Sequence, residues 1–257
     1  MAILEDKKLL ITGVLTDDSL AFNVAALALH EGAEVILTGA GRGYSITKRV
    51  AKKLKADVDV LELDVTVPSQ ADQVAKEIEQ KWGKLDGVLH AIGYAPEKCL
   101  GKGILEADWN DVKVAIEISS YSLKLLAKAF QSLLKKSASP SIIGLDFDAS
   151  KAWPTYDWMG IAKASLESLT RYLARDLGKD NIRVNLIAAG PFKTVAAKSI
   201  PNFVKFEDAW QDRSPLGWDV TDSSSVAKAC VALFSDWFPM TTGEIIHVDG
   251  GFHAVGA

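Results

Sequence analysis

Tyr156 and Lys163 stand seven positions apart near the start of a predicted helix. Seven residues make about two helical turns, so both side chains project from one face with their Cα atoms roughly 10 Å apart. A phenol has an ordinary pKa of about 10 and can donate a proton or a hydrogen bond. An ammonium group on the same face can hold ribose hydroxyls and make that phenol a better acid. The pair therefore indicates a catalytic site, although a Tyr and a Lys so spaced could also be two solvated surface residues.

The spacing of the pair bears on the type of reaction. Common short-chain dehydrogenases place Tyr four residues before Lys and reduce a carbonyl, but here Met159 occupies that position. Moving the phenol three residues further from Lys163 displaces its Cα by about 4.5 Å. Conjugate reduction of an α,β-unsaturated thioester needs such a shift, because the hydride arrives at the β-carbon and the charged oxygen lies two atoms further away. Tyr156 is then predicted to stabilise the enolate oxygen.

Seven short apolar segments alternate with helical patterns along the chain. The expected strands are 9–12, 33–38, 58–63, 85–92, 141–147, 182–188 and 244–248, and the clearest helices are 19–31, 109–134, 156–177 and 223–233. Continuously apolar strands indicate a parallel sheet covered on both faces, and right-handed crossovers make it doubly wound. We therefore expect an α/β fold: a single Rossmann-type domain, 1–257, with about seven strands. The irregular stretch 190–217, with a possible short helix at 206–213, is a candidate substrate-binding loop.

The cofactor motif after the first strand is unusual. A G-x-G-x-x-G is absent, and Gly13 is followed by five residues and then Ser19. Gly13 permits a tight turn, while Ser19 could cap the next helix or meet a phosphate at its N-terminus. Arg42, after the second strand, could meet a 2′-phosphate, stack on adenine or simply be solvated. Asp64 could accept from an adenine amine or form a turn, and Gly93 could admit a cofactor or merely end a strand.

Composition narrows the class of protein. The chain has 257 residues, of which 48% are hydrophobic and 24% charged, as in globular domains. A net charge of −4 argues against nucleic acid as a partner. Cys99 and Cys230 form neither a metal-binding spacing nor a disulfide framework, and free thiols suit a reducing cytoplasm. We find no signal peptide and no run of about 18 apolar residues, so we expect no membrane span, no metal and a cytoplasmic enzyme.

Several segments together resemble the NADH-dependent enoyl-acyl-carrier-protein reductases, a divergent group of short-chain dehydrogenases, and their mycobacterial members in particular. In chain order the segments are Gly13-x5-Ser19-x-Ala21, Asp64-Val65, Gly87 to Gly93, Asp146-Phe147-Asp148, Tyr156-x6-Lys163, Ala188 to Pro191, Leu233 to Trp237 and Thr242 to Gly251. The resemblance implies that Tyr156 bonds the thioester carbonyl and stabilises the enolate. It implies that Phe147 lies beside the nicotinamide and helps to aim the hydride, and that Lys163 holds the nicotinamide ribose.

The resemblance also implies the rest of the site. NADH would be the cofactor, an acyl-carrier-protein or CoA thioester the substrate, and a homotetramer the assembly. The acyl pocket would be walled by Trp153 and Met159. The implied cofactor contacts are Gly13, Ser19 and Leu20 at the pyrophosphate, Asp64 and Val65 at the adenine, Ile92 and Gly93 near the adenosine-side ribose, and Thr194 at a phosphate.

Two departures from the family pattern carry expectations of their own. The 190–217 stretch is shorter than the mycobacterial substrate loop, which predicts a shorter or more open acyl pocket and shorter preferred chains. Ala40 replaces an aromatic at the adenine, so stacking there would be weaker or pass to Arg42. The competing interpretations are a carbonyl-reducing short-chain dehydrogenase, which Met159 at the usual tyrosine position disfavours, and a dinucleotide-binding sensor without turnover.

Overall fold

The computed structural model describes residues 2–194, 197 and 200–256, which contain one sheet of seven parallel strands. The strands are β1 (Lys8–Ile11), β2 (Glu34–Gly39), β3 (Asp59–Glu62), β4 (Gly87–His90), β5 (Ser141–Asp146), β6 (Arg183–Ala189) and β7 (Ile245–Val248). Their spatial order is β3-β2-β1-β4-β5-β6-β7, and the predicted doubly wound Rossmann-type sheet is confirmed. The main difference is β4, which is shorter at both ends than the predicted 85–92.

The strand order reverses beside β1. Leu10 of β1 pairs with Ile36 of β2 on one side and with Val88 of β4 on the other. The strands that follow β1 in the chain extend the sheet on one side, and those that follow β4 extend it on the other. The loops after β1 and β4 therefore diverge. Such a switch point opens a crevice beyond the carboxyl ends of the strands, where open α/β sheets bind their ligands.

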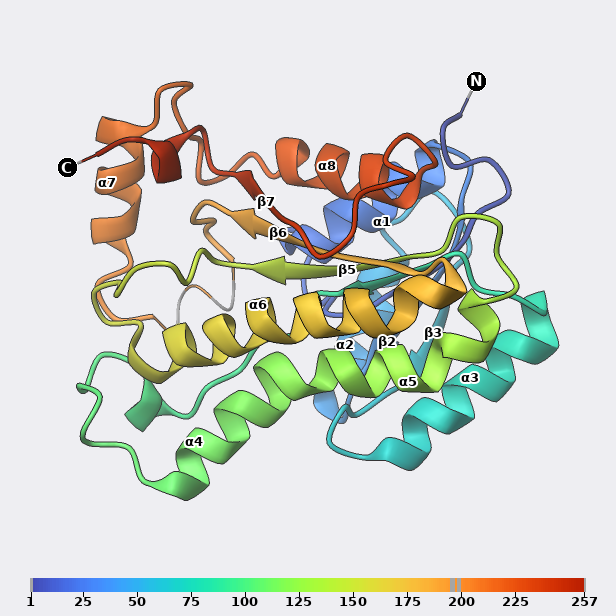
Figure 1. Cartoon of the computed structure of the whole chain (residues 1–257), viewed down its shortest axis with the longest axis horizontal. Coiled ribbons are helices and arrows are strands. Elements are labelled where there is room, and N and C mark those ends of the chain that lie inside the picture. Colours follow the sequence, from blue (N-terminus) through green and yellow to red (C-terminus); the bar gives the residue numbers. More distant parts are fainter. Residues whose placement is uncertain (1, 195–196, 198–199, 257) are drawn as a thin grey trace.

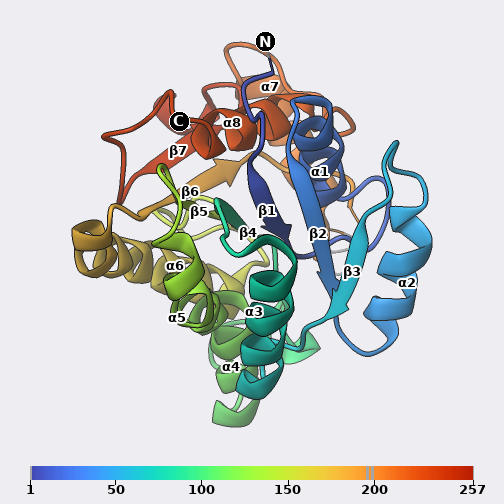
Figure 2. The same cartoon turned by 90° about the vertical axis from the view of Figure 1, so that its right-hand side faces the viewer.

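Helices cover both faces of the sheet (Figures 1 and 2). The helices α1 (Leu20–His30), α2 (Arg42–Ala51) and α8 (Ser224–Phe234) lie on one face, and α3 (Pro68–Trp82), α5 (Ser122–Leu134) and α6 (Asp157–Leu177) lie on the other. On that second face, α4 (Trp109–Ile116) leads into α5. The short helices η1 (Glu97–Cys99), η3 (Gly178–Asp180) and η5 (Phe252–Ala254) lie in connections. Helix α7 (Val204–Arg213) stands apart, beyond the carboxyl end of β5.

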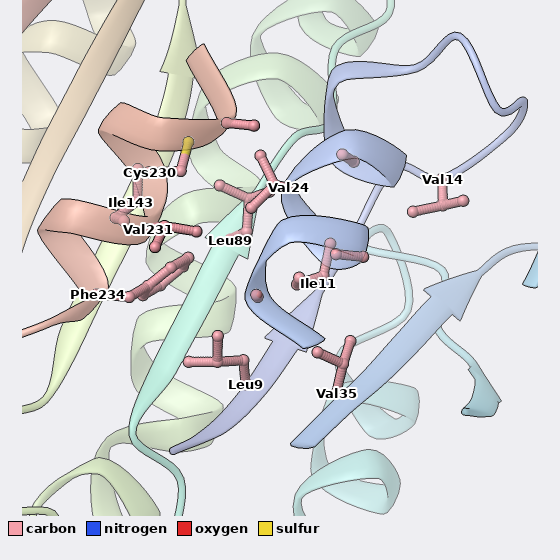
Figure 3. Packing of buried hydrophobic residues seen from close by; sticks show 14 of the residues in the cluster. Leu9, Ile11, Val14, Val24, Val35, Leu89, Ile143, Cys230, Val231 and Phe234 are labelled. Carbon is pink, nitrogen blue, oxygen red and sulfur yellow. The ribbon is translucent and has the colours of Figure 1, made fainter. Parts of the chain in front are cut away.

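One hydrophobic layer is built where α1 and α8 meet over the central strands (Figure 3). Val24 from α1 and Phe234 from α8 converge on Leu9 and Leu89 in this layer. A Cβ at Gly87 would lie 2.5 Å from the Phe234 ring, so glycine is what lets α8 pack this closely on β4. This face of the sheet is a packed core, and the chemistry must therefore lie at the strand ends.

Two of the predicted helices differ from the structure in ways that bear on the site. The expected helix 109–134 is interrupted by a π-helical turn at Glu117–Tyr121, which places Ser119 and Ser120 inside the protein. The expected helix 156–177 begins one residue later, so Tyr156 precedes α6 as its N-cap residue. No helix in residues 2–194, 197 and 200–256 has both the length and the apolarity needed to cross a bilayer.

Candidate active site

Tyr156 is held at the start of α6 by two strained neighbours. Thr155 and Asp157 both have positive φ, 61° and 39°, which side chains other than glycine adopt at a cost. The Thr155 hydroxyl donates to the carbonyl of Pro201, and the Asp157 carboxylate accepts from the backbone N–H of Gly103. These contacts tie the tyrosine to two distant loops, and backbone strain of this kind is concentrated at functional sites.

The Tyr156 side chain is enclosed but remains a hydrogen-bond donor. The residue is 7% exposed, and its ring meets Phe147 edge-on at a centroid distance of 5.2 Å. Burial, with a smaller contribution from the charge of Asp146, raises the pKa of the phenol well above its usual range. The phenol therefore keeps its proton at physiological pH. Met159, one turn along α6, belongs to the same buried cluster.

Lys163 lies two turns into α6 and is also buried, at 8% exposure. Its Nζ donates a 2.8 Å hydrogen bond to the carbonyl of Leu145 and lies 3.9 Å from a carboxylate oxygen of Asp146. Burial lowers the pKa of Lys163, and the charges of Asp146 and Glu167 oppose that shift. Tyr156, Met159 and Lys163 thus share the buried side of α6, against the carboxyl end of β5.

The loop after β1 has the geometry of a phosphate site. Gly13 has a φ of 83°, and a Cβ there would lie 2.0 Å from the carbonyl oxygen of Ala91, so only glycine fits. At the start of α1, the backbone N–H groups of Leu20 and Ala21 have no protein acceptor among the described residues. Free N–H groups at a helix N-terminus suit an anion. The Ser19 hydroxyl does not cap α1 but donates to the carbonyl of Thr16. These residues fit a dinucleotide pyrophosphate.

Asp64 takes the turn-forming role that the sequence left open. One of its carboxylate oxygens accepts from both the backbone N–H and the hydroxyl of Thr66. The other oxygen makes no hydrogen bond among the described residues, and the predicted contact with adenine depends on it. Val65 is half-buried and packs on the core of the α3 face.

The remaining predicted cofactor residues lie at the same edge of the sheet. Ile92 and Gly93 follow β4, with Ile92 half-buried and Gly93 exposed. Thr194 follows β6, and its hydroxyl oxygen accepts from the backbone N–H of Ala197. Arg42 is exposed at the first turn of α2. Each of these contacts with a cofactor stays a prediction.

An aromatic wall extends from Phe147 to α7. Trp153 lies 5.2 Å from Phe147 by ring centroids, and its indole N–H donates to the carbonyl of Asp148. Trp210 of α7 stacks on Phe252 at 3.7 Å with the planes 7° apart. A cavity of about 260 Å³ opens between α7 and the 151–155 segment; among its lining residues are Trp153, Thr155, Phe206, Ala209, Trp210 and Phe252. The wall therefore runs from the candidate catalytic tyrosine to a cavity lined by aromatic side chains together with Lys205 and Arg213.

Sequence reasoning missed three residues of this site. Phe206 and Trp210 lay in a possible short helix within an irregular stretch, and nothing in that pattern indicated which side chains face the site. Asp146 was part of a family motif but received no role. Its signal was a carboxylate ending an otherwise apolar strand, next to an aromatic.

The doubly wound sheet, the glycine turn after β1 and the enclosed tyrosine–lysine pair define a dinucleotide-dependent oxidoreductase of the short-chain type. Residues 13–253 match the family model described as enoyl-(acyl carrier protein) reductase. The chain belongs to that family.

Its relatives extend over nearly the whole chain. The NADH enoyl-[acyl-carrier-protein] reductase of Mycolicibacterium smegmatis is 41% identical, over 97% of this chain and 97% of the relative. Enzymes of the same name from Aquifex aeolicus and Escherichia coli are 38% and 37% identical; they cover 100% and 98% of this chain and 94% and 96% of their own lengths. The resemblance drawn from the motifs is confirmed.

Proposed function

We propose that this protein reduces the 2,3 double bond of trans-2-enoyl thioesters with NADH, as a step of fatty acid elongation. The observation that carries the proposal is the enclosed Tyr156 phenol, placed edge-on to Phe147 at the end of β5 with Lys163 two turns behind it. The family membership and the printed names of the relatives support the same reaction and the same cofactor.

Different residues of the chain bind the cofactor and exclude water in this reaction. When bound, NADH supplies the hydride. Gly13 and the N–H groups of Leu20 and Ala21 would hold the pyrophosphate, and the Lys163 ammonium would donate to the nicotinamide ribose. Phe147 and its aromatic neighbours exclude water from the reacting carbons.

Tyr156 stabilises the charge that develops on the substrate. Its protonated phenol would donate to the thioester oxygen, and this hydrogen bond strengthens as that oxygen becomes an enolate. The alternative to this assignment, carbonyl reduction by a Tyr four residues before Lys163, has no tyrosine to perform it, because Met159 stands there.

The test is NADH oxidation, followed by loss of its absorbance, with short, medium and long trans-2-enoyl chains on CoA and on acyl-carrier protein. Turnover with enoyl thioesters and NADH is expected, with ketones turned over far more slowly. Absence of turnover with every chain length on both carriers would refute the proposal. Tight NADH binding without any turnover would instead favour a sensor.

Two further parts of the proposal concern assembly and location. A homotetramer is supported by large exposed apolar side chains on three adjacent helices: Trp109, Tyr121, Ile161 and Tyr172. Mass measurement in solution tests it, and a monomer at working concentration would contradict it. Cys99 and Cys230 are free and buried, which fits a reducing compartment such as the cytoplasm.

A further inference from the structure

Asp146 is a buried carboxylate without hydrogen-bond partners. It ends β5, its side chain has no exposed surface, and neither oxygen accepts a hydrogen bond among the described residues. Buried polar groups are nearly always paired, and a buried carboxylate left unpaired is costly. An unpaired one at the edge of an active site indicates a function that offsets its cost.

Lys163 is the cation that faces this carboxylate. Its Nζ lies 3.9 Å from Oδ1 of Asp146, close enough for charge attraction but too far for a hydrogen bond. Lys163 has three N–H donors, and the carbonyl of Leu145 takes one of them. The other titratable groups near the carboxylate are Glu167 on α6, Tyr156 before α6 and Asp148 on the following loop, and His90 on β4 lies near Lys163.

His90 supplies no positive charge here. Its Nε2 lies 2.7 Å from the hydroxyl of Ser122, and that hydroxyl donates its own proton to the carbonyl of Ile118. Nε2 must therefore carry the proton, which leaves Nδ1 unprotonated in the neutral ring. Burial, aided by the charge of Lys163, lowers the pKa of His90 to about 3. Lys163 is thus the cation on which Asp146 depends.

We propose that Asp146 is the positioning residue for Lys163, holding the ammonium group charged at the end of β5 for the ribose hydroxyls of the cofactor. The inference rests on the proposed function. Because Asp146 has no exposed surface, it acts through Lys163 and does not itself touch the cofactor. A movement of about 1 Å would turn the present ion pair into a charge-assisted hydrogen bond.

This role makes cofactor affinity depend on pH. Burial raises the pKa of Asp146 to about 7, although the charge of Lys163 opposes the shift. NADH is bound best when Asp146 is ionised, so affinity should fall as pH drops through about 7. In Asp146→Asn this dependence should disappear, and at pH 8 the Kd for NADH should rise about tenfold, the value of one charge-assisted hydrogen bond.

The stability of the protein without cofactor should change with pH in the opposite sense to its affinity for NADH. The pKa of Asp146 in the folded protein, about 7, lies above the ordinary carboxyl value of 3.8, so the folded state binds this proton more tightly than the unfolded state. Ionisation therefore destabilises the protein progressively as pH rises between these two values. The Asp146→Asn variant without cofactor should melt higher than the wild type at pH 8, by a margin that shrinks towards pH 4.

The decisive experiment is NADH fluorescence titration across pH with four proteins: wild type, Asp146→Asn, Lys163→Met and the double variant. If Asp146 acts through Lys163, the Asn change should cost no further affinity once Lys163 is gone. Asp148→Asn is the matched control, because its carboxylate accepts from Ser150 through oxygens that an amide partly retains. It should keep the affinity of the wild type at pH 8 and should still lose affinity at low pH, with a midpoint slightly below that of the wild type, because the charge of Asp148 helps to raise the pKa of Asp146.

Each outcome of these titrations supports or overturns the role of Asp146. A pH dependence of Kd in Asp146→Asn parallel to the wild type, or an additive double variant, overturns the inference and leaves the proposed function intact. Asp146→Ala repeats the test if the amide variant does not fold. Failure of the wild type to bind NADH at any pH overturns the inference and the proposed function together.

Discussion

The protonation of Tyr156 determines what this side chain can do in the reaction. An exposed phenol near its ordinary pKa could lose its proton at moderately alkaline pH, whereas burial against Phe147 keeps this one protonated. The chain enforces that burial with two positive-φ residues, which an unconstrained helix start would avoid. The strain therefore maintains a protonated donor at the position where we propose that the substrate oxygen binds.

We predict that Tyr156→Phe lowers kcat about a hundredfold and changes KM little. The hydrogen bond strengthens in the transition state, and removing one oxyanion donor typically costs 10²–10³ in rate. Steady-state kinetics with an enoyl thioester measures the effect, and NADH titration checks that the cofactor site is intact. An unchanged kcat would remove Tyr156 from the mechanism.

At the scale of the elements, the sequence predicted the regular strands and helices better than the local departures from regular structure. Apolar strands and their glycine ends were enough for the sheet, because the central strands bury both faces. The π-helical turn at Glu117–Tyr121 has no sequence pattern distinct from the helix around it. The turn formed by Asp64 and Thr66 depends on a side-chain rotamer. The lack of hydrogen-bond partners at the Asp146 carboxylate depends on how three elements of the fold pack around it.

We propose that helix α7 determines how much room an acyl chain finds. Phe206 is 5% exposed, lies 5.7 Å from Phe147 by ring centroids and lines the cavity of about 260 Å³. A tail that extends from Tyr156 along the aromatic wall would reach this ring. The size of residue 206 should therefore limit chain length.

We predict that Phe206→Leu shifts the preference towards longer enoyl chains. Each additional methylene accommodated in an apolar pocket is worth about 1–3 kcal/mol, so the ratio of kcat/KM for long over short chains should rise at least tenfold. Phe203→Leu is the matched control, since Phe203 precedes α7 and does not line the cavity. An identical chain-length profile in both variants would show that α7 does not bound the acyl site.

At the scale of the whole molecule, the carboxyl ends of the strands form the candidate site, and the amino ends contribute to stability. The carboxyl ends carry the strained and unpaired groups of the site. At the amino end of β6, Arg183 is 5% exposed and donates to the carbonyls of Leu233, Ser235 and Phe238 and to the hydroxyl of Ser139. One guanidinium thereby joins β6 to the end of α8 and to the loop before β5.

We predict that Arg183→Met destabilises the protein by about 3–5 kcal/mol while the remaining folded protein binds NADH as the wild type does. The substitution keeps the aliphatic length but leaves three carbonyls without their donor, two of them in buried bonds, and each such loss costs about 1–3 kcal/mol. Urea unfolding measures the first effect and NADH titration the second. Arg175→Met is the control, because Arg175 is exposed on α6 and contacts only surface groups among the described residues, the Asp176 carboxylate and the exposed Tyr172 ring, so its unfolding midpoint should barely move. A weaker NADH affinity in folded Arg183→Met would mean that the amino end of the sheet also shapes the site, and that stability and function are not separated along the strands.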